Sequence, residues 1–201
     1  MQPDVDHLHE RARAHLLESA ESKRMVAEKC LDSILAAAHL IADTFRSGGK
    51  VLLCGNGGSA ADCQHMAAEF VSRLATDFER PGLPAIALAT DTSFLTAFAN
   101  DFGFEGLFER QVQVLGKPRD ALIGISTSGN STNVIRAVEA ARAADMQAIV
   151  LTGNSGRLAE MASVAISVPT ANTQYIQEAH LAIEHILCAL VECYLFGRGS
   201  G

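Results

Sequence analysis

The stretch that decides the fold reads GGKVLLCGNGGSAADCQHMAAEFVSR and covers residues 48–73. Its apolar run, residues 51–54, lies between glycines and predicts a short buried strand. A Gly-Asn-Gly-Gly turn follows at residues 55–58, and Ser59 is expected to cap a helix that begins at Ala60. Glycines let the backbone approach a ligand, and a helix N-terminus favours anions. This strand, turn and helix therefore predict a phosphate-binding site.

The predicted helix carries His65 and Glu69, which lie four residues apart and so share one face. They are candidates for a metal site or an acid/base pair, although the pair taken alone is more typical of a solvated helix face. GNGGSA also matches the dinucleotide pattern G-x-G-x-x-A. That pattern needs an acidic residue at the end of the next strand, whereas Asp77 and Glu79 lie in a loop before the next apolar run. We therefore give the dinucleotide interpretation little weight.

Composition limits the classes of function. The chain has 201 residues, 48% of them hydrophobic, and a net charge of −7. This length suits one α/β domain, and the negative charge disfavours a nucleic-acid surface. We expect no membrane partner, because no apolar run approaches the length of a membrane span and the charged N-terminus lacks a signal-peptide core. Five cysteines without a C-x-x-C pair suggest reduced thiols and a cytoplasmic protein.

The rest of the chain alternates strands and helices. Two long helices are expected over residues 5–46, and further strands at 85–89, 121–125, 148–151 and 164–168. One helix is expected to be capped by residues 90–93 and to end near residue 99. Further helices are expected at 104–115, 132–144, 157–162 and 173–196. This order predicts an α/β fold with one open, mostly parallel sheet and right-handed crossovers. We divide the chain into N-terminal helices, 1–48, and one main unit, 49–201. The surplus apolar surface of those helices is expected to meet another subunit.

A second candidate anion site follows the third strand. Ser126, Thr127, Ser128 and Ser131 place four hydroxyls directly after a buried strand and before a helix. Together with backbone N–H groups they can bind a phosphate without Lys or Arg. A single Ser/Thr turn more often only caps a helix, but ligands bind at the carboxyl ends of strands in open α/β sheets. Anion binding is therefore the preferred interpretation.

The last helix is apolar on most sides yet contains polar residues that need partners. These are Gln177, Glu178, His180, Glu184 and His185. Five such residues in one stretch indicate a site. Spacing does not decide whether His180 or His185 belongs to it, although Gln177 and Glu184 lie nearest to one face.

Four motifs together resemble the phosphoheptose isomerases, which are sugar isomerase (SIS) domain proteins. They are CGNGGSAADCQHMAAEF, LATDTSFLTAFANDFG, GISTSGNS and IQEAHLAIEHILC, and the resemblance spans about residues 48–197. It implies a five-stranded parallel sheet in a flavodoxin-like three-layer sandwich, and a homotetramer with sites at subunit interfaces. It also implies interconversion of sedoheptulose 7-phosphate and D-glycero-D-manno-heptose 7-phosphate, which feeds heptose into bacterial lipopolysaccharide or related glycans.

The resemblance also implies specific site residues and one zinc ion per subunit. The zinc ligands would be His65, Glu69, Gln177 and His185, and the catalytic pair would be Glu69 and His185. The expected substrate contacts are Asn56, Gly57, Gly58, Ser59, Glu69, Asn100, Asp101, Ser126, Thr127, Ser128, Ser131 and Gln177. In this scheme Glu69 moves a proton between neighbouring carbons through a cis-enediol(ate).

An alternative is a non-catalytic SIS-domain adaptor that binds a replication initiator protein. That group is similar through the glycine turn and the Ser/Thr loop. It lacks the acid at the position of Glu69 and the histidine at the position of His185, and this chain has both. The pair therefore favours the enzyme.

Overall fold

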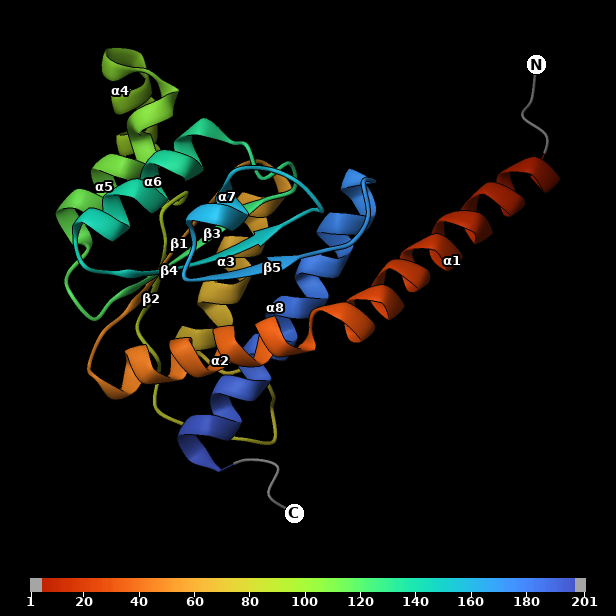
Figure 1. The fold of residues 1–201 in the computed structure, drawn as a ribbon, viewed down its shortest axis with the longest axis horizontal. Coiled ribbons are helices and arrows are strands. Elements are labelled where there is room, and N and C mark those ends of the chain that lie inside the picture. The colour runs from red at the N-terminus through yellow and green to blue at the C-terminus, as the bar shows by residue number, and fades with distance from the viewer. Residues whose placement is uncertain (1–4, 198–201) are drawn as a thin grey trace.

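The computed structural model describes residues 5–197 (Figure 1). Two helices, α1 (Val5–Lys29) and α2 (Leu31–Arg46), come before the first strand. The remaining elements are β1 (Val51–Gly55), α3 (Gly58–Val71), β2 (Ala85–Ala87), α4 (Thr92–Phe102), the 3-10 turn η1 (Phe104–Gly106), α5 (Leu107–Leu115), β3 (Ala121–Ser126), α6 (Thr132–Ala143), β4 (Gln147–Thr152), α7 (Leu158–Met161), β5 (Val164–Ser167) and α8 (Thr173–Phe196). All five predicted strands are present. The second is shorter than expected, because the chain turns after Ala87, whose carbonyl accepts a hydrogen bond from the Thr90 hydroxyl.

The five strands form one parallel sheet in the order β2-β1-β3-β4-β5. Helices α2, α3 and α8 cover one face, and α5, α6 and α7 cover the other (Figure 1). Each face has its own apolar core, because side chains alternate between the faces along a strand. The central strands β1 and β3 are buried throughout, as expected for a sheet covered on both sides. The predicted three-layer α/β fold is confirmed.

The sheet order places a topological switch point between β1 and β3. From β1 the chain crosses to β2 on one side, and the later strands add on the other. In parallel sheets of this kind, ligands bind at the carboxyl ends of the strands beside the switch point. The glycine turn follows β1 and the hydroxyl-rich loop follows β3, so this topology brings the two predicted anion sites together.

Helix α3 begins earlier than the sequence suggested. Its first residue is Gly58 and its N-cap is Gly57, with a φ of 56° and no capping bond from a side chain. Ser59 is therefore not the cap but a buried residue of the first turn. The positive φ of Gly57 lets the chain enter the helix directly after the turn, which an L side chain at this position would oppose. No side chain caps the start of α3, so N–H groups of its first turn can donate to a ligand, although those of Ala60 and Ala61 already donate to the Gly57 carbonyl oxygen.

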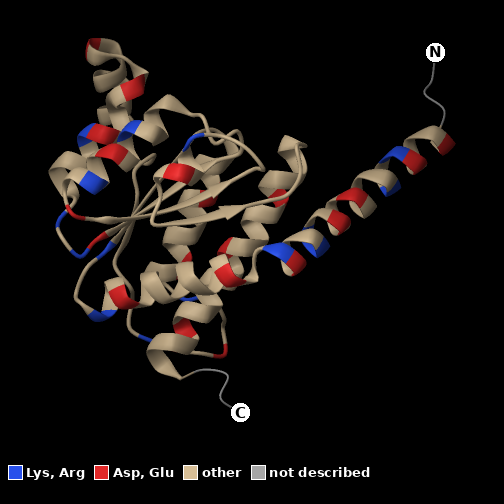
Figure 2. Cartoon of the chain, viewed as in Figure 1, with Lys and Arg blue, Asp and Glu red and all other residues tan. Residues whose placement is uncertain are grey.

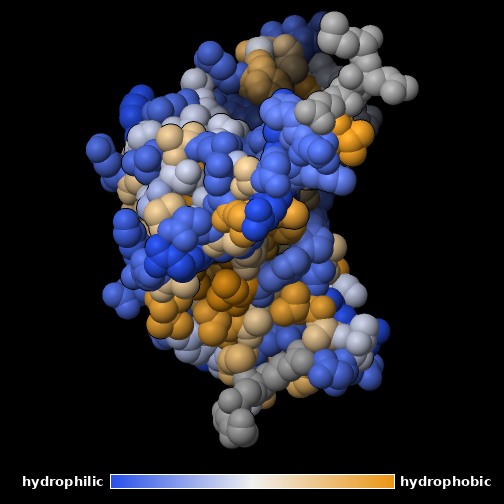
Figure 3. All heavy atoms as spheres, turned by 90° about the vertical axis from the view of Figure 1, so that its right-hand side faces the viewer, coloured by the Kyte–Doolittle hydropathy of each residue, from blue (hydrophilic) through white to orange (hydrophobic). Residues whose placement is uncertain are grey.

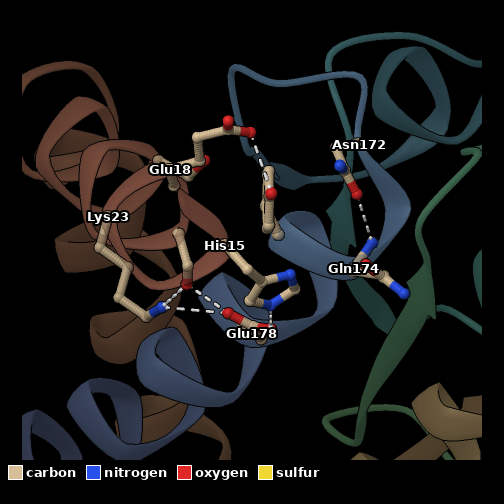
Figure 4. Close-up of polar contacts among 9 residues, drawn as sticks. His15, Glu18, Lys23, Asn172, Gln174 and Glu178 are labelled. Atoms are coloured by element: carbon tan, nitrogen blue, oxygen red, sulfur yellow. Dashed lines mark hydrogen bonds and ion pairs between the residues drawn. The ribbon is translucent and has the colours of Figure 1, made fainter. Parts of the chain in front are cut away.

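Helix α1 projects from the body of the molecule and carries charges of both signs along its length (Figures 1 and 2). The middle of α1 binds the start of α8, where three α1 side chains contact the Glu178 carboxylate (Figure 4). His15 Nε2 lies 2.8 Å from Glu178 Oε1, Lys23 forms an ion pair with the same carboxylate, and the Ser19 hydroxyl donates to it. The Ser19 bond is the main cause of the lowered pKa of Glu178. Helix α1 thus contacts the main unit at the start of α8, whereas α2 is part of the core, with Ile34, Ala38 and Ile41 buried.

Helix α8 corrects one expectation from the sequence. It is long and apolar enough, by length and composition alone, to cross a membrane. In the structure it packs against α2 and α3, with Ile183, Leu187 and Val191 buried in the core. Its apolar character therefore has an explanation within the α/β fold.

Candidate functional site

The glycine turn and the hydroxyl-rich loop lie side by side at the carboxyl ends of β1 and β3. Gly55 is paired in register with Ile125, one residue before Ser126. The amide groups of Asn56 and Asn133 join the two segments by reciprocal hydrogen bonds of 2.9 and 2.8 Å. Two backbone segments that the sequence separates by about seventy residues thus form one rigid rim for a ligand.

The hydroxyls of the loop after β3 cluster with one another. Ser126 Oγ lies 2.9 Å from Ser131 Oγ and 3.4 Å from Ser128 Oγ. Ser131 is the N-cap of α6, yet its side chain makes no capping bond. Gly129 closes the loop with a φ of 64°, and a Cβ there would lie 2.4 Å from the Ser155 carbonyl oxygen. Hydroxyls held together in front of a helix N-terminus can donate to an anion, so the arrangement fits a phosphate.

Helices α3 and α8 bring the predicted acid/base residues together. His65 Nε2 lies 2.8 Å from His185 Nε2 and 3.8 Å from Glu69 Oε1. Glu69 is largely buried, and its second oxygen, Oε2, has no hydrogen-bond partner among the described residues. A carboxylate held in this state can accept a proton from a bound molecule, because no other group competes for it.

Gln177 completes this group of residues. Its side-chain amide fills the space beside Gly58, where a Cβ would lie only 1.6 Å from Gln177 Nε2. It also hydrogen-bonds to Asp62, whose pKa is raised by burial in spite of this bond and of the nearby His65. Asp62 therefore holds the amide of Gln177 in place, and α3 needs a glycine at its first position to leave room for it.

The five polar residues of α8 do not form one site. Gln177 and His185 face α3, whereas Glu178 binds α1. His180 is fully buried, with Nε2 3.1 Å from the Thr152 carbonyl oxygen, and burial lowers its pKa to about 4. Glu184 is buried beneath the site, and burial, then Asp62, raises its pKa to about 9. The two histidines that spacing could not separate thus occupy different environments.

The buried state of His180 predicts a loss of stability in mild acid. Its folded pKa, about 4, lies below the unfolded value of 6.5. Between these two values the unfolded chain binds more protons, so the free energy of unfolding falls as the pH drops from 6.5 to 4. The difference corresponds to about 3 kcal/mol. Urea unfolding of His180→Gln should show a slope smaller by about one proton in this range, whereas exposed His39→Gln should not. Equal slopes in both variants would contradict the assignment.

Asn100 and Asp101 lie apart from this group of residues. Both are exposed on α4, where the Asn100 amide donates to Asp101 Oδ1 at 2.8 Å. Helix α4 has no buried residue and packs on η1 and α5, on the face of the sheet opposite α3 and α8. A single chain therefore does not bring the predicted contacts Asn100 and Asp101 to Glu69 and His185.

The donor chemistry of the α3–α8 group fits the zinc expected from the sequence. It offers two imidazoles, a carboxylate with an unpartnered oxygen, and an amide oxygen. Zinc binds nitrogen and carboxylate ligands well, and an amide oxygen less commonly. As the side chains stand, no group of three or more His, Cys, Asp or Glu residues within 5–197 is arranged to hold a metal ion. Cys63 is fully buried in the apolar core, where burial raises the pKa of its thiol well above the usual value.

Sequence reasoning missed Asp62 and Asn133, two residues that support the site. Asp62 lies three residues before His65, but nothing in its spacing indicated a bond to Gln177, which is more than a hundred residues away. Asn133 lies in the first turn of α6, and nothing in its position there indicated its hydrogen bonds to Asn56. Both act through partners that only the tertiary fold supplies.

Comparisons with known proteins agree with this geometry. The SIS domain family matches residues 15–153. The phosphoheptose isomerase of Burkholderia pseudomallei is 52% identical, over 89% of this chain and 93% of its own length. That of Thiobacillus denitrificans is 50% identical, over 94% and 98%. The solved structure of the phosphoheptose isomerase from Neisseria gonorrhoeae superimposes with a TM-score of 0.86, at 44% identity over 92% of this chain and 98% of that one. The chain therefore belongs to the phosphoheptose isomerase family of SIS-domain proteins.

Proposed function

We propose that this protein isomerises sedoheptulose 7-phosphate to D-glycero-D-manno-heptose 7-phosphate. The observation that carries the proposal is the meeting of Glu69 on α3 with the imidazoles of His65 and His185, in a chain that also has a hydroxyl-rich anion loop at the end of β3. Moving a carbonyl from C2 to C1 requires a base that takes a proton from one carbon and returns it to the next. The phosphoheptose isomerases of Burkholderia pseudomallei and Neisseria gonorrhoeae support the same activity here.

In this mechanism the hydroxyls of Ser126, Ser128 and Ser131 bind the phosphate and fix the distance from it to the reacting carbons. Glu69 removes the proton from the carbon beside the carbonyl and returns it to the neighbouring carbon of a cis-enediol(ate). His185 moves the proton between the two oxygens. Helices α3 and α8 lie side by side, so both groups can reach the same bound sugar.

Zinc would be held by His65, Glu69, Gln177 and His185, and when bound it supplies a Lewis acid that polarises the substrate carbonyl. A metal also competes with the proton for a carboxylate or an imidazole, so tight coordination would weaken Glu69 as a base. The amide of Gln177, a weak ligand for zinc, is consistent with a loosely held ion.

The test is an isomerase assay with purified protein and sedoheptulose 7-phosphate, alongside pentose, hexose and amino-sugar phosphates. We expect turnover of the seven-carbon substrate to be fastest, and zinc to be found in the same preparation by elemental analysis. Binding of sugar phosphates without turnover would instead favour a non-catalytic adaptor. The product would feed heptose for lipopolysaccharide or related glycans. A cytoplasmic location is supported by the five free cysteines.

We further propose a homotetramer with sites at its interfaces. Large apolar side chains are exposed on α1, α2 and α8, and hydrophobic surface gathers on the side of the molecule shown in Figure 3. The exposed apolar side chains on these three helices include Leu8, Leu16, Leu17, Leu31, Leu35, Leu181 and Ile186. Exposed apolar surface of this kind is typical of subunit contacts. The distance of Asn100 and Asp101 from Glu69 within one chain is consistent with a site completed by a neighbouring subunit.

Analytical ultracentrifugation at micromolar concentration should show a tetramer. Leu16→Glu/Leu17→Glu should dissociate it, because two charges would replace apolar contacts of α1. Arg13→Glu, on the same helix but at a charged exposed position, is the matched control and should leave the assembly intact. An active wild-type monomer would refute both the assembly and the shared site.

A further inference from the structure

Arg80 lies in the loop between α3 and β2, yet its side chain is almost completely buried, with 1% exposed. Its guanidinium group reaches the C-terminal end of α3. Nη2 donates to the Glu69 carbonyl oxygen at 2.7 Å, and Nη1 donates to the Phe70 carbonyl oxygen at 2.9 Å. Nε donates to Glu192 Oε1 at 2.7 Å, and this carboxylate is equally buried. One side chain therefore connects the backbone of Glu69 to helix α8.

The contacts between α3 and α8 lie at three levels. Gly58 meets Gln177 at the first, and His65 meets His185 at the second. The third level is the carbonyl group of Glu69, reached through Arg80 from Glu192. Sequence numbers rise together at the three levels, so the two helices run parallel. His185 and Glu192 are seven residues apart and lie on one face of α8. The third level thus sets how far α3 can slide along α8.

We propose that Arg80 and Glu192 are positioning residues, which hold α3 and α8 in the register that brings Glu69 and His65 to His185. This inference rests on the proposed isomerase function. It assigns the pair a role in catalysis although neither side chain is assigned a contact with the substrate.

The chemistry of the pair supports a positional role over a purely stabilising one. A buried ion pair seldom stabilises a protein more than apolar residues of similar size, because both ions lose their hydration. An apolar pair, however, makes no directional contacts that would fix the positions of the two helices relative to each other. The planar guanidinium holds its donors at fixed angles, and here they bind two successive carbonyls of α3 and one carboxylate of α8. Lysine carries the same charge but lacks this planar set of hydrogen-bond donors.

The decisive variant is Arg80→Met/Glu192→Leu, which keeps the volume and removes both charges together. We expect kcat to fall tenfold or more while KM for the sugar phosphate changes less than threefold, because the anion loop after β3 makes no contact with Arg80. Arg80→Lys should lie between this variant and the wild type. Lys50→Met is the control: it breaks a second largely buried ion pair, with Asp120 at the amino ends of β1 and β3, and should leave kcat unchanged.

A second measurement keeps this test separate from the proposed function. The imidazole nitrogen signals of His65 and His185, assigned in NMR spectra through His→Gln variants, report their contact whether or not the protein turns over a sugar. They should shift in Arg80→Met/Glu192→Leu and in Arg80→Lys, but not in Lys50→Met. If the double variant does not fold, Arg80→Lys decides. A folded Arg80 variant with wild-type kcat and unshifted imidazole signals would overturn the proposal, whereas an inactive wild type would refute only the isomerase function.

Discussion

Glu69→Gln should lower kcat for isomerisation by a factor of about 10²–10⁴, the usual loss when a general base is removed. Glutamine keeps the size of the side chain but cannot take a proton at physiological pH. The backbone of residue 69 would stay in place, because Arg80 binds its carbonyl group and not its side chain. Substrate binding, measured by calorimetry, should therefore persist in the inactive variant.

Two comparisons make this experiment specific. Glu139→Gln, on the exposed face of α6, removes one carboxylate far from the α3–α8 group and should leave kcat unchanged. Zinc content must be measured in every variant, because an amide binds zinc more weakly than a carboxylate. Loss of activity with zinc retained identifies Glu69 as the base, and loss of both activity and zinc identifies it mainly as a ligand.

His185→Gln should also lower kcat, with a smaller loss if His185 only moves protons between oxygens. Full activity of Glu69→Gln would favour the adaptor.

Periodicity and glycine positions were enough to predict the sheet and most element boundaries. Residues 51–54 and 121–125 were recognisable as buried strands because they are continuous apolar runs between turn residues. The start of α3 was misplaced for a local reason. Ser59 is a good capping residue by type, but Gly57, two residues before it, adopts a positive φ and begins the helix earlier. Residue preference is a weak guide where a glycine offers a second conformation.

The candidate site was predictable only in part. His65 and Glu69 share a helix, so spacing alone placed them on one face. His185 and His180 could not be separated, because that choice depends on which side of α8 meets α3 and which meets β4. Asp62, Asn133 and Arg80 act through partners far away in the sequence. Local spacing carries no information about such pairs.

The second large effect is expected at the anion loop, in the variant Ser126→Ala/Ser128→Ala. Both hydroxyls belong to the cluster before α6, and Ser126 is buried at the end of β3. Each charge-assisted hydrogen bond lost to a phosphate costs about 1.5–3 kcal/mol, so the loss of two should raise KM by at least about two orders of magnitude. The fold should survive, because Ser131 can replace its lost partner with water.

The effect on kcat distinguishes anchoring from catalysis. If the phosphate only anchors the substrate, saturating substrate should restore most of the turnover. If the anchor also aligns the reacting carbons with Glu69, kcat should fall as well, because orientation contributes to the barrier. Ser47→Ala/Ser163→Ala removes two hydroxyls that make hydrogen bonds to the backbone near the amino ends of the strands, away from the anion loop. It should change neither KM nor kcat. An unchanged KM in a folded Ser126→Ala/Ser128→Ala variant would exclude this loop as the phosphate site. The first turn of α3, with Gly57 and Gly58, would then be the remaining anion site at the switch point of the sheet.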